Sequence, residues 1–287
     1  MTKRILIVGG NGQLGNCIPK IAPDFENQYE FNFTDAQTLN ITDRDSVSDV
    51  FYDFKPHFCI NASAYTAVDL AEKEPEKAFA VNAEGVANLA EACEEYNCVL
   101  IHVSTDDVFD GETSISYSEV SFTHPQGVYG ASKLKGEELA TDLNPKTIVI
   151  RTSWLYSEFN KNFVKTMLNL FSQKDELGIV ADQFGQPTNS NDLAEAIMKI
   201  IETEPKTYGI FHFSNYPETT WFEFAQKIAE FSGSKIRLNA ITTEKFPTPA
   251  KRPKRSTMSL DKIEETYKIE LKHWENTLQD CIETLQK

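Results

Sequence analysis

The stretch Ile5-Leu6-Ile7-Val8-Gly9-Gly10-Asn11-Gly12-Gln13-Leu14-Gly15 predicts the fold of this chain. Its first four residues are apolar and mostly β-branched, which is typical of a strand buried on both faces of a parallel sheet. The glycines that follow permit a tight turn and let backbone N–H groups approach a pyrophosphate at a helix N-terminus. A plain glycine-rich turn is the alternative. The preceding strand and the following helical pattern favour a dinucleotide-binding loop of Gly9, Gly12, Gln13, Leu14 and Gly15.

Strand-like and helix-like segments alternate through the first half of the chain. The strands are expected at residues 5–8, 30–33, 58–60, 99–103 and 147–150, with helices near 43–54, 75–96 and from 129 onward. Five strands alternating with helices predict a doubly wound parallel sheet, an α/β fold with its ligand outside the carboxyl ends of the strands.

Beyond Arg151 the regular alternation of predicted strands and helices ends. We expect helices at 162–173 and 191–202, a late strand at 210–213, and a helix through Phe231 that begins with a capping box of Thr220 and Glu223. The predicted dinucleotide-binding domain therefore spans 1–150 and is rejoined by about 189–213. Residues 151–188 and 214–287 are expected to form a smaller substrate-binding domain.

Two further segments are expected to contact the dinucleotide. Asp35, 20 residues after Gly15, follows the second strand and can accept hydrogen bonds from an adenosine ribose while repelling a 2′-phosphate. A solvated loop carboxylate is an equal alternative, so NADH is favoured over NADPH only by this one residue. Asn61, Ala62 and Ser63 follow the third strand, where a cofactor lying across the sheet requires small residues.

The segment Tyr129-Gly130-Ala131-Ser132-Lys133 pairs a phenol with an ammonium on one face of a helix. A nearby cation favours the phenolate, so the pair predicts a tyrosine whose pKa is lowered into the range useful for acid–base work. Ser104, Thr105 and Asp106 end the fourth strand, where hydroxyl groups can hold a substrate oxygen beside Tyr129. Turn formation is the alternative for these three residues.

Composition excludes several classes of partner. Lys and Arg number 28 and Asp and Glu number 43, a formal charge of −15 that disfavours nucleic acid and anionic membranes. No stretch approaches the ~20 apolar residues of a membrane span, and no signal peptide is visible. Five scattered cysteines suit a reducing compartment, and the five histidines show no metal-ligand spacing. We therefore expect a soluble, cytoplasmic protein without a catalytic metal.

Residues 247–256 contain four cations within five positions, 251–255. In an acidic chain this cluster predicts contact with an anion such as a substrate diphosphate, because arginine binds phosphate oxygens in bidentate fashion. A solvated basic loop is the alternative.

In this order, the glycine loop, the Ser104-Thr105 strand end and the Tyr129-x-x-x-Lys133 pair resemble the extended short-chain dehydrogenase/reductase superfamily. Further stretches narrow the resemblance, over about residues 5–280, to the dTDP-4-dehydrorhamnose reductase family. They are Gly12-Gln13-Leu14-Gly15, Thr66-Ala67-Val68-Asp69, Val128-Tyr129-Gly130, Lys133-Leu134-x-Gly136-Glu137, Arg151-Thr152-Ser153-Trp154, Asn162-Phe163, Asp182-Gln183-Phe184-Gly185-x-Pro187-Thr188 and Pro247-Thr248-Pro249-Ala250-x-Arg252-Pro253.

The resemblance implies a Rossmann-like fold and hydride transfer from NADPH or NADH to C4 of dTDP-4-dehydro-β-L-rhamnose, giving dTDP-β-L-rhamnose. It implies that Tyr129 protonates the developing alkoxide, that Lys133 tunes Tyr129 and holds the nicotinamide ribose, and that Thr105 orients the carbonyl. The residues that it implies for the substrate are Val68, Ser104, Asp106, Trp154, Asn162 and Arg252.

One residue departs from the family pattern. The family usually carries an aromatic residue after Thr-Asp, where this chain has Asp107. An acid there also resembles the nucleotide-sugar dehydratases and epimerases of the superfamily, which rank below the reductase. A non-catalytic, dinucleotide-binding regulatory subunit is the alternative from another class, and the intact Thr105, Tyr129 and Lys133 argue against it.

Some members of the family bind Mg²⁺ at a dimer interface through a C-terminal glutamate cluster. Residues 275–287 do not clearly reproduce that cluster, so the sequence does not support Mg²⁺ and leaves a homodimer open.

Overall fold

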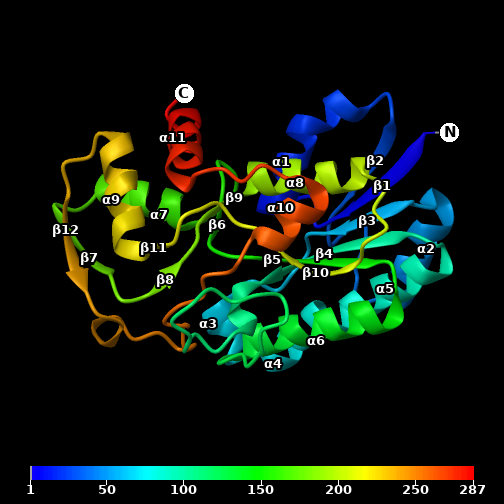
Figure 1. Cartoon of the computed structure of the whole chain (residues 1–287), viewed down its shortest axis with the longest axis horizontal. Coiled ribbons are helices and arrows are strands. Elements are labelled where there is room, and N and C mark those ends of the chain that lie inside the picture. The colour runs from blue at the N-terminus through cyan, green and yellow to red at the C-terminus, as the bar shows by residue number, and fades with distance from the viewer. Residues whose placement is uncertain (1) are drawn as a thin grey trace.

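A six-stranded parallel sheet forms the centre of the larger part of the molecule (Figure 1). The computed structural model describes residues 2–287. The strands of the sheet lie in the order β10-β5-β4-β3-β1-β2. They are β1 Lys3–Val8, β2 Tyr29–Thr34, β3 Phe58–Asn61, β4 Val99–Thr105, β5 Thr147–Thr152 and β10 Gly209–His212. The order reverses between β1 and β3, the position at which a doubly wound sheet opens a crevice. The predicted α/β fold is confirmed.

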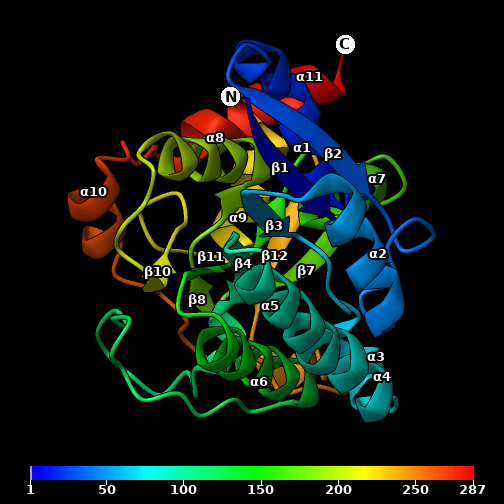
Figure 2. The same cartoon turned by 90° about the vertical axis from the view of Figure 1, so that its right-hand side faces the viewer.

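Helices cover both faces of this sheet (Figure 2). On one face lie α1 Gln13–Ile21, η1 Ala22–Phe25, α8 Ser190–Glu202 and α10 Asp261–Tyr267. On the other lie α2 Arg44–Phe54, α3 Val68–Ala71, α4 Pro75–Phe79, η2 Ala80–Glu84, α5 Gly85–Glu95 and α6 Val128–Leu143, with η3 Asp106–Val108 following β4.

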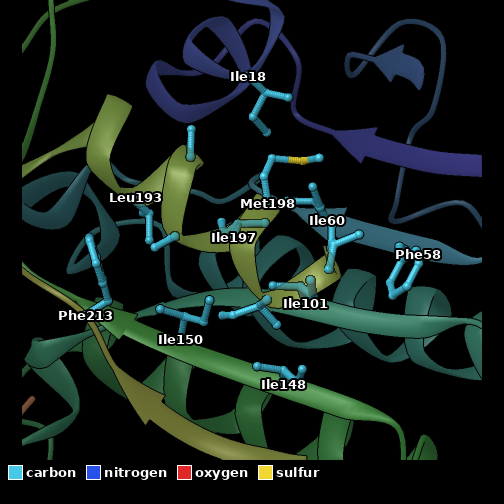
Figure 3. Packing of buried hydrophobic residues seen from close by; sticks show 14 of the residues in the cluster. Ile18, Phe58, Ile60, Ile101, Ile148, Ile150, Leu193, Ile197, Met198 and Phe213 are labelled. Atoms are coloured by element: carbon cyan, nitrogen blue, oxygen red, sulfur yellow. The ribbon is translucent and has the colours of Figure 1, made fainter. Parts of the chain in front are cut away.

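A hydrophobic core lies on each face of the sheet, and strand β1 contributes to both because its side chains point alternately to the two faces. Ile5 and Ile7 belong to the cluster that includes α1 and α8, whereas Leu6 and Val8 belong to the cluster with α2 and α5. Figure 3 shows the first cluster, in which Leu193, Ile197 and Met198 lie over the isoleucines of the strands. Burial on both faces is the reason why these strands read as continuous apolar runs.

The smaller part of the molecule is built around α7, α9 and α11, on the left of Figure 1. Its elements are β6 Leu155–Tyr156, α7 Phe163–Phe171, β7 Glu176–Val180, β8 Phe184–Gly185, β9 Thr188–Asn189, β11 Thr219–Thr220, α9 Trp221–Ser232, β12 Arg237–Ile241, η4 Thr243–Lys245 and α11 Trp274–Leu285. The expected capping box is present, because the Thr220 and Glu223 side chains each bond the other's backbone N–H. Strands β7 and β12 pair in parallel at the outer edge.

The division into two domains stays a prediction. Strand β10 and α8, from the segment expected to rejoin the first domain, lie with the large sheet. From the second domain's expected range, Ile263 and Tyr267 of α10 also pack into that sheet's core.

One helix differs from its expected form. The periodicity of residues 75–96 predicts a single α-helix, but a π turn, η2, separates α4 from α5. The Asn82 amide in this turn bonds the backbone of Tyr65 and the Ser132 hydroxyl of α6. Hydrophobic periodicity does not report such polar contacts. Within residues 2–287, no helix is long and apolar enough to cross a bilayer.

Candidate active site

The glycine turn after β1 brings α1 against the strand. Gly9 has φ of 88°, and a Cβ there would lie 2.7 Å from the Ser63 backbone nitrogen. A Cβ on Gly15 would overlap the carbonyl oxygen of Gly9, so this glycine permits the close contact of helix and turn. Within residues 2–287, no side chain caps the first turn of α1, which leaves its N–H groups facing the crevice.

A cavity of about 1240 Å³ opens at the carboxyl ends of the central strands. Most of the residues predicted from sequence line it. They are Gly9, Gly12, Gln13, Leu14, Asp35, Ala62, Ser63, Val68, Ser104, Thr105, Asp106, Tyr129, Lys133, Trp154 and Arg252. The structure therefore brings the glycine turn and the Tyr129 helix to one continuous space.

In the described part of the chain, three predicted residues lie behind this lining: Gly15, Asn61 and Asn162. The Asn61 side chain accepts hydrogen bonds from the backbone and hydroxyl of Ser63 at 3.1 and 2.6 Å and so holds the cavity wall. Asn162 caps α7, and its amide donates to Gln13 Oε1 at 3.0 Å. Their positions suit support of the wall.

Tyr129 and Lys133 share one face of α6, as the four-residue spacing predicts. The Lys133 ammonium is 2 % exposed and donates to the Val103 carbonyl at 2.7 Å. Burial lowers the pKa of Lys133 to about 8, an effect that the carboxylate of Glu137 opposes. The Thr105 hydroxyl lines the same cavity as the Tyr129 phenol and donates to Asp106 Oδ1 at 3.2 Å.

The expected lowering of the Tyr129 pKa is wrong for this form of the protein. Burial of the phenol, followed by the charge of Asp107, raises its pKa above the ordinary value, and the polar Thr105 side chain offsets this only in part. The sequence reveals neither the depth of the phenol nor the distance to Asp107. The consequence is a phenol that carries its proton at neutral pH.

Strand β4 ends in a cluster of polar side chains. Ser104 directs its hydroxyl to Glu137, which binds Arg151 through two nitrogens in a buried ion pair of 2.7 Å. Asp106 is 5 % exposed, and burial and the adjacent Asp107 raise its pKa to about 8. Burial raises the pKa of Asp107, and the charge of Arg252 opposes this rise.

Two tryptophans form part of the cavity wall. Trp154 stacks on Trp221 with ring centroids 3.6 Å apart and planes 11° apart, and both line the cavity. Gly185 packs against the Trp154 ring, where a Cβ would lie 2.6 Å from Cε2. Sequence reasoning missed Trp221 because it occupies the first turn of α9, 67 positions from Trp154, and no local spacing joins the two.

The comparisons with known proteins agree with this geometry. A family model described as the RmlD substrate binding domain matches residues 3–287. A dTDP-4-dehydrorhamnose reductase from Aggregatibacter actinomycetemcomitans is 44% identical, over 96% of this chain and 97% of that protein. This chain belongs to the dTDP-4-dehydrorhamnose reductase family. The resemblance inferred from the motifs is confirmed, and so is the prediction that the chain is a reductase of this family.

Two solved structures of the family share the fold throughout. The dTDP-4-dehydrorhamnose reductase from Clostridium acetobutylicum has a TM-score of 0.94 and 40% identity, with 99% of this chain and 100% of that chain covered. The enzyme from Bacillus anthracis, solved in complex with NADP, has a TM-score of 0.94 and 37% identity over the same shares.

The family's basic loop divides its cations among different partners. Arg252 lines the cavity and binds Asp69 at 2.9 Å, whereas Lys251 donates to Gln126. Arg255 pairs with Glu218 and lies over the Phe184 ring. The cluster seen in the sequence therefore contributes mainly Arg252 to the site.

Asp35 lines the cavity from the turn after β2. It accepts from the Asn11 amide at 2.8 Å and from backbone N–H groups of residues 37 and 38. The bond from Thr38 is the first cause that holds the pKa of Asp35 below its usual range, so the carboxylate is charged at neutral pH. Among residues 2–287, no group of three or more His, Cys, Asp or Glu side chains is placed to hold a metal ion.

Proposed function

We propose that this protein reduces the C4 ketone of dTDP-4-dehydro-β-L-rhamnose to the alcohol of dTDP-β-L-rhamnose, with Tyr129 as the general acid. The observation that carries the proposal is the convergence of Thr105, Tyr129 and Lys133 on a cavity that continues to the glycine turn. The choice of dTDP as the nucleotide and of 4-dehydrorhamnose as the sugar is supported by membership of the reductase family.

The glycine turn fits a nicotinamide dinucleotide. Gly9 and Gly12 leave room for a pyrophosphate at the uncapped N-terminus of α1, and Gln13, Leu14, Ala62 and Ser63 line the space beside it. When bound, the dinucleotide supplies the hydride. The charged Asp35 suits a ribose with a free 2′-hydroxyl, so NADH is the expected coenzyme, although a relative was solved with NADP.

Tyr129 would give its proton to the C4 oxygen as negative charge develops there. The raised pKa keeps the phenol protonated until that charge appears. Thr105 would orient the carbonyl, and Lys133 would lie beside the nicotinamide ribose as a buried cation.

We assign the remaining substrate contacts to other residues that line the cavity. Trp154 would pack against the sugar, and Val68 with Ser104 would border it. Arg252 would face the diphosphate, and its side chain would then move from Asp69 or bind both. Asn162 would act through Gln13. The two-domain division, a homodimer and a cytoplasmic location belong to the same proposal.

The experiment that tests this function is consumption of reduced nicotinamide with dTDP-4-dehydrorhamnose, measured separately with NADH and NADPH. We expect prompt turnover with a lower KM for NADH. Absence of turnover with both coenzymes, in protein that binds NADH, would contradict the proposed substrate.

The role of Tyr129 is tested by Tyr129→Phe, which removes the phenolic proton and keeps the ring. We expect kcat to fall by about 10²-fold or more, the usual contribution of a positioned acid, with little change in NADH affinity. Tyr52→Phe, at an exposed tyrosine, is the matched control and should turn over normally. Wild-type kcat in Tyr129→Phe would show that another group donates the proton.

A further inference from the structure

Glu137 of α6 binds two neighbouring strands of the central sheet at their carboxyl ends. Its carboxylate accepts from Arg151 Nε at 3.0 Å and from Arg151 Nη2 at 2.7 Å, and it also accepts from the Ser104 hydroxyl. Ser104 of β4 and Arg151 of β5 are paired residues in the sheet. All three side chains are 3 % exposed or less. One buried carboxylate therefore joins α6, β4 and β5.

The elements that meet at Glu137 carry the groups proposed for catalysis. Lys133 and Tyr129 precede Glu137 by four and eight positions on one face of α6, and Thr105 is the last residue of β4. These three residues line the cavity, whereas in the described part of the chain Glu137 lies behind that lining. A carboxylate outside the cavity thus holds together the helix and the strand whose side chains form it.

Arg151 makes a second contact with the segment that follows β4. Its guanidinium carbon lies 5.1 Å from the ring centroid of Phe109, the residue after η3. Ser104 and Phe109 therefore both contact the ion pair, and Thr105 lies between them in the chain. Because this short segment is held at both ends, a shift of the ion pair would move the Thr105 hydroxyl.

A buried ion pair is a weak source of stability. Removing two charges from water costs about as much free energy as their attraction provides, and an apolar pair of the same size often stabilises a fold equally well. What the pair does provide is direction, because a guanidinium binds a carboxylate through two nitrogens in one plane. Direction matters beside a reacting centre, where a displacement of ~1 Å can lower a rate by about 10²-fold.

We propose that the ion pair of Glu137 and Arg151 positions catalytic groups, because it fixes the Thr105 hydroxyl relative to the cavity-lining face of α6. This inference rests on the function proposed above. It predicts that kcat depends on the ion pair even where the stability of the fold does not. A pair with a structural role alone predicts the opposite: every variant that is as stable as the wild type reduces the ketone equally fast.

The first test combines Glu137→Met with Arg151→Met, which replaces the ion pair by apolar side chains. Because neither charge is left buried without its partner, we expect a melting temperature close to that of the wild type. With NADH and dTDP-4-dehydrorhamnose, kcat should fall by about tenfold or more, while each KM should change by less than about threefold. Wild-type kcat in this variant would show that the pair is only structural, and would overturn the proposal.

The matched control removes a different ion pair from the same helix. Lys135 and Glu138 bind each other at 3.0 Å on the exposed face of α6. Lys135→Gln combined with Glu138→Gln should leave kcat, both KM values and the melting temperature unchanged. An equal fall of kcat in this control would assign the effect to α6 as a whole and would contradict a specific role of Glu137.

Arg151→Lys gives a second test that does not need the apolar pair to fold. Lysine keeps a positive charge beside Glu137, but its ammonium lacks the planar fork that fixes the carboxylate. We expect kcat to fall by about threefold or more, with the KM for the sugar nearly constant. Wild-type kcat with a raised KM would show that the pair shapes the sugar site instead, and would also overturn the proposal.

The route through Ser104 is tested by adding Ser104→Ala to the wild type and to the apolar-pair variant. In the wild type, the substitution breaks the bond to Glu137 and should lower kcat. In the apolar-pair variant that bond is already lost, so kcat should change by less than about twofold. Equal effects in both backgrounds would contradict this route.

None of these results bears on the reductase assignment, which fails only when the wild-type protein does not reduce dTDP-4-dehydrorhamnose.

Discussion

At the scale of single residues, the sequence predicts the role of the glycine turn but not the protonation state of Tyr129. Gly9 and Gly15 were predictable because the reason for each is local: a backbone conformation in one, and a close contact within a short segment in the other. The pKa of Tyr129 was not, because burial and Asp107 outweigh the lysine four positions away. Spacing identifies which groups meet, whereas their protonation depends on everything packed around them.

Gly15→Ala tests the turn. The added Cβ would overlap the Gly9 carbonyl oxygen, and backbone on both sides offers no room to move. We expect the free energy of unfolding to fall by about 1–3 kcal/mol, the usual cost of overpacking. NADH affinity, measured by fluorescence titration, should fall by about tenfold, since the turn that faces the pyrophosphate shifts.

Gly233→Ala is the control for that experiment. Gly233 ends α9 with φ of 71° in open space, so alanine there costs about 1 kcal/mol of strain far from the cavity. Its NADH affinity should equal that of the wild type. An equal loss of affinity in both variants would assign the effect to general stability.

At the scale of elements, every strand of the central sheet could be predicted, but the π turn between α4 and α5 could not. Apolar runs between turn residues predict buried strands. The π turn depends on Asn82, whose amide joins the Tyr65 loop to Ser132 of α6. It also depends on Gly136, which lets the backbones of α6 and the π turn meet. Such long-range contacts leave no periodic signal.

Gly136→Ala should therefore separate α6 from the π turn. A Cβ on Gly136 would overlap the Asn82 carbonyl oxygen, and α6 carries Tyr129 and Lys133. We expect a lower melting temperature and a fall in kcat larger than any change in NADH affinity. Lys135→Ala, on the exposed face of the same helix, should alter neither. Unchanged kcat in Gly136→Ala would mean that this contact does not position the catalytic side chains.

At the scale of the whole molecule, pH acts on the fold through buried groups from distant parts of the sequence. Burial lowers the pKa of His212, at the end of β10, to about 3, with the charges of Arg151 and Lys262 adding to the effect. His102 on β4 shifts in the same direction, mainly through burial. Asp106 shifts the opposite way and weakens the fold as pH rises from about 4 to about 8.

The sign for His212 follows from linkage. Its folded pKa lies below its unfolded value, so the unfolded chain binds the extra proton. Its contribution to stability is therefore complete above pH 6.5 and is lost as pH falls toward 3. His212→Asn keeps a donor for the Ser259 carbonyl and cannot be charged. Between pH 7 and pH 5, its melting temperature should fall less than that of the wild type, even when it begins lower.

The control for this last prediction is His124→Asn, because His124 is exposed on the loop before α6. That variant should follow the wild-type curve at every pH. If His212→Asn also follows it, the acid sensitivity of the fold originates elsewhere, and His102, bonded to Asn61 behind the cofactor-facing wall, becomes the next residue to replace. Loss of NADH affinity before unfolding would then distinguish His102, since Asn61 holds Ser63 at the cavity.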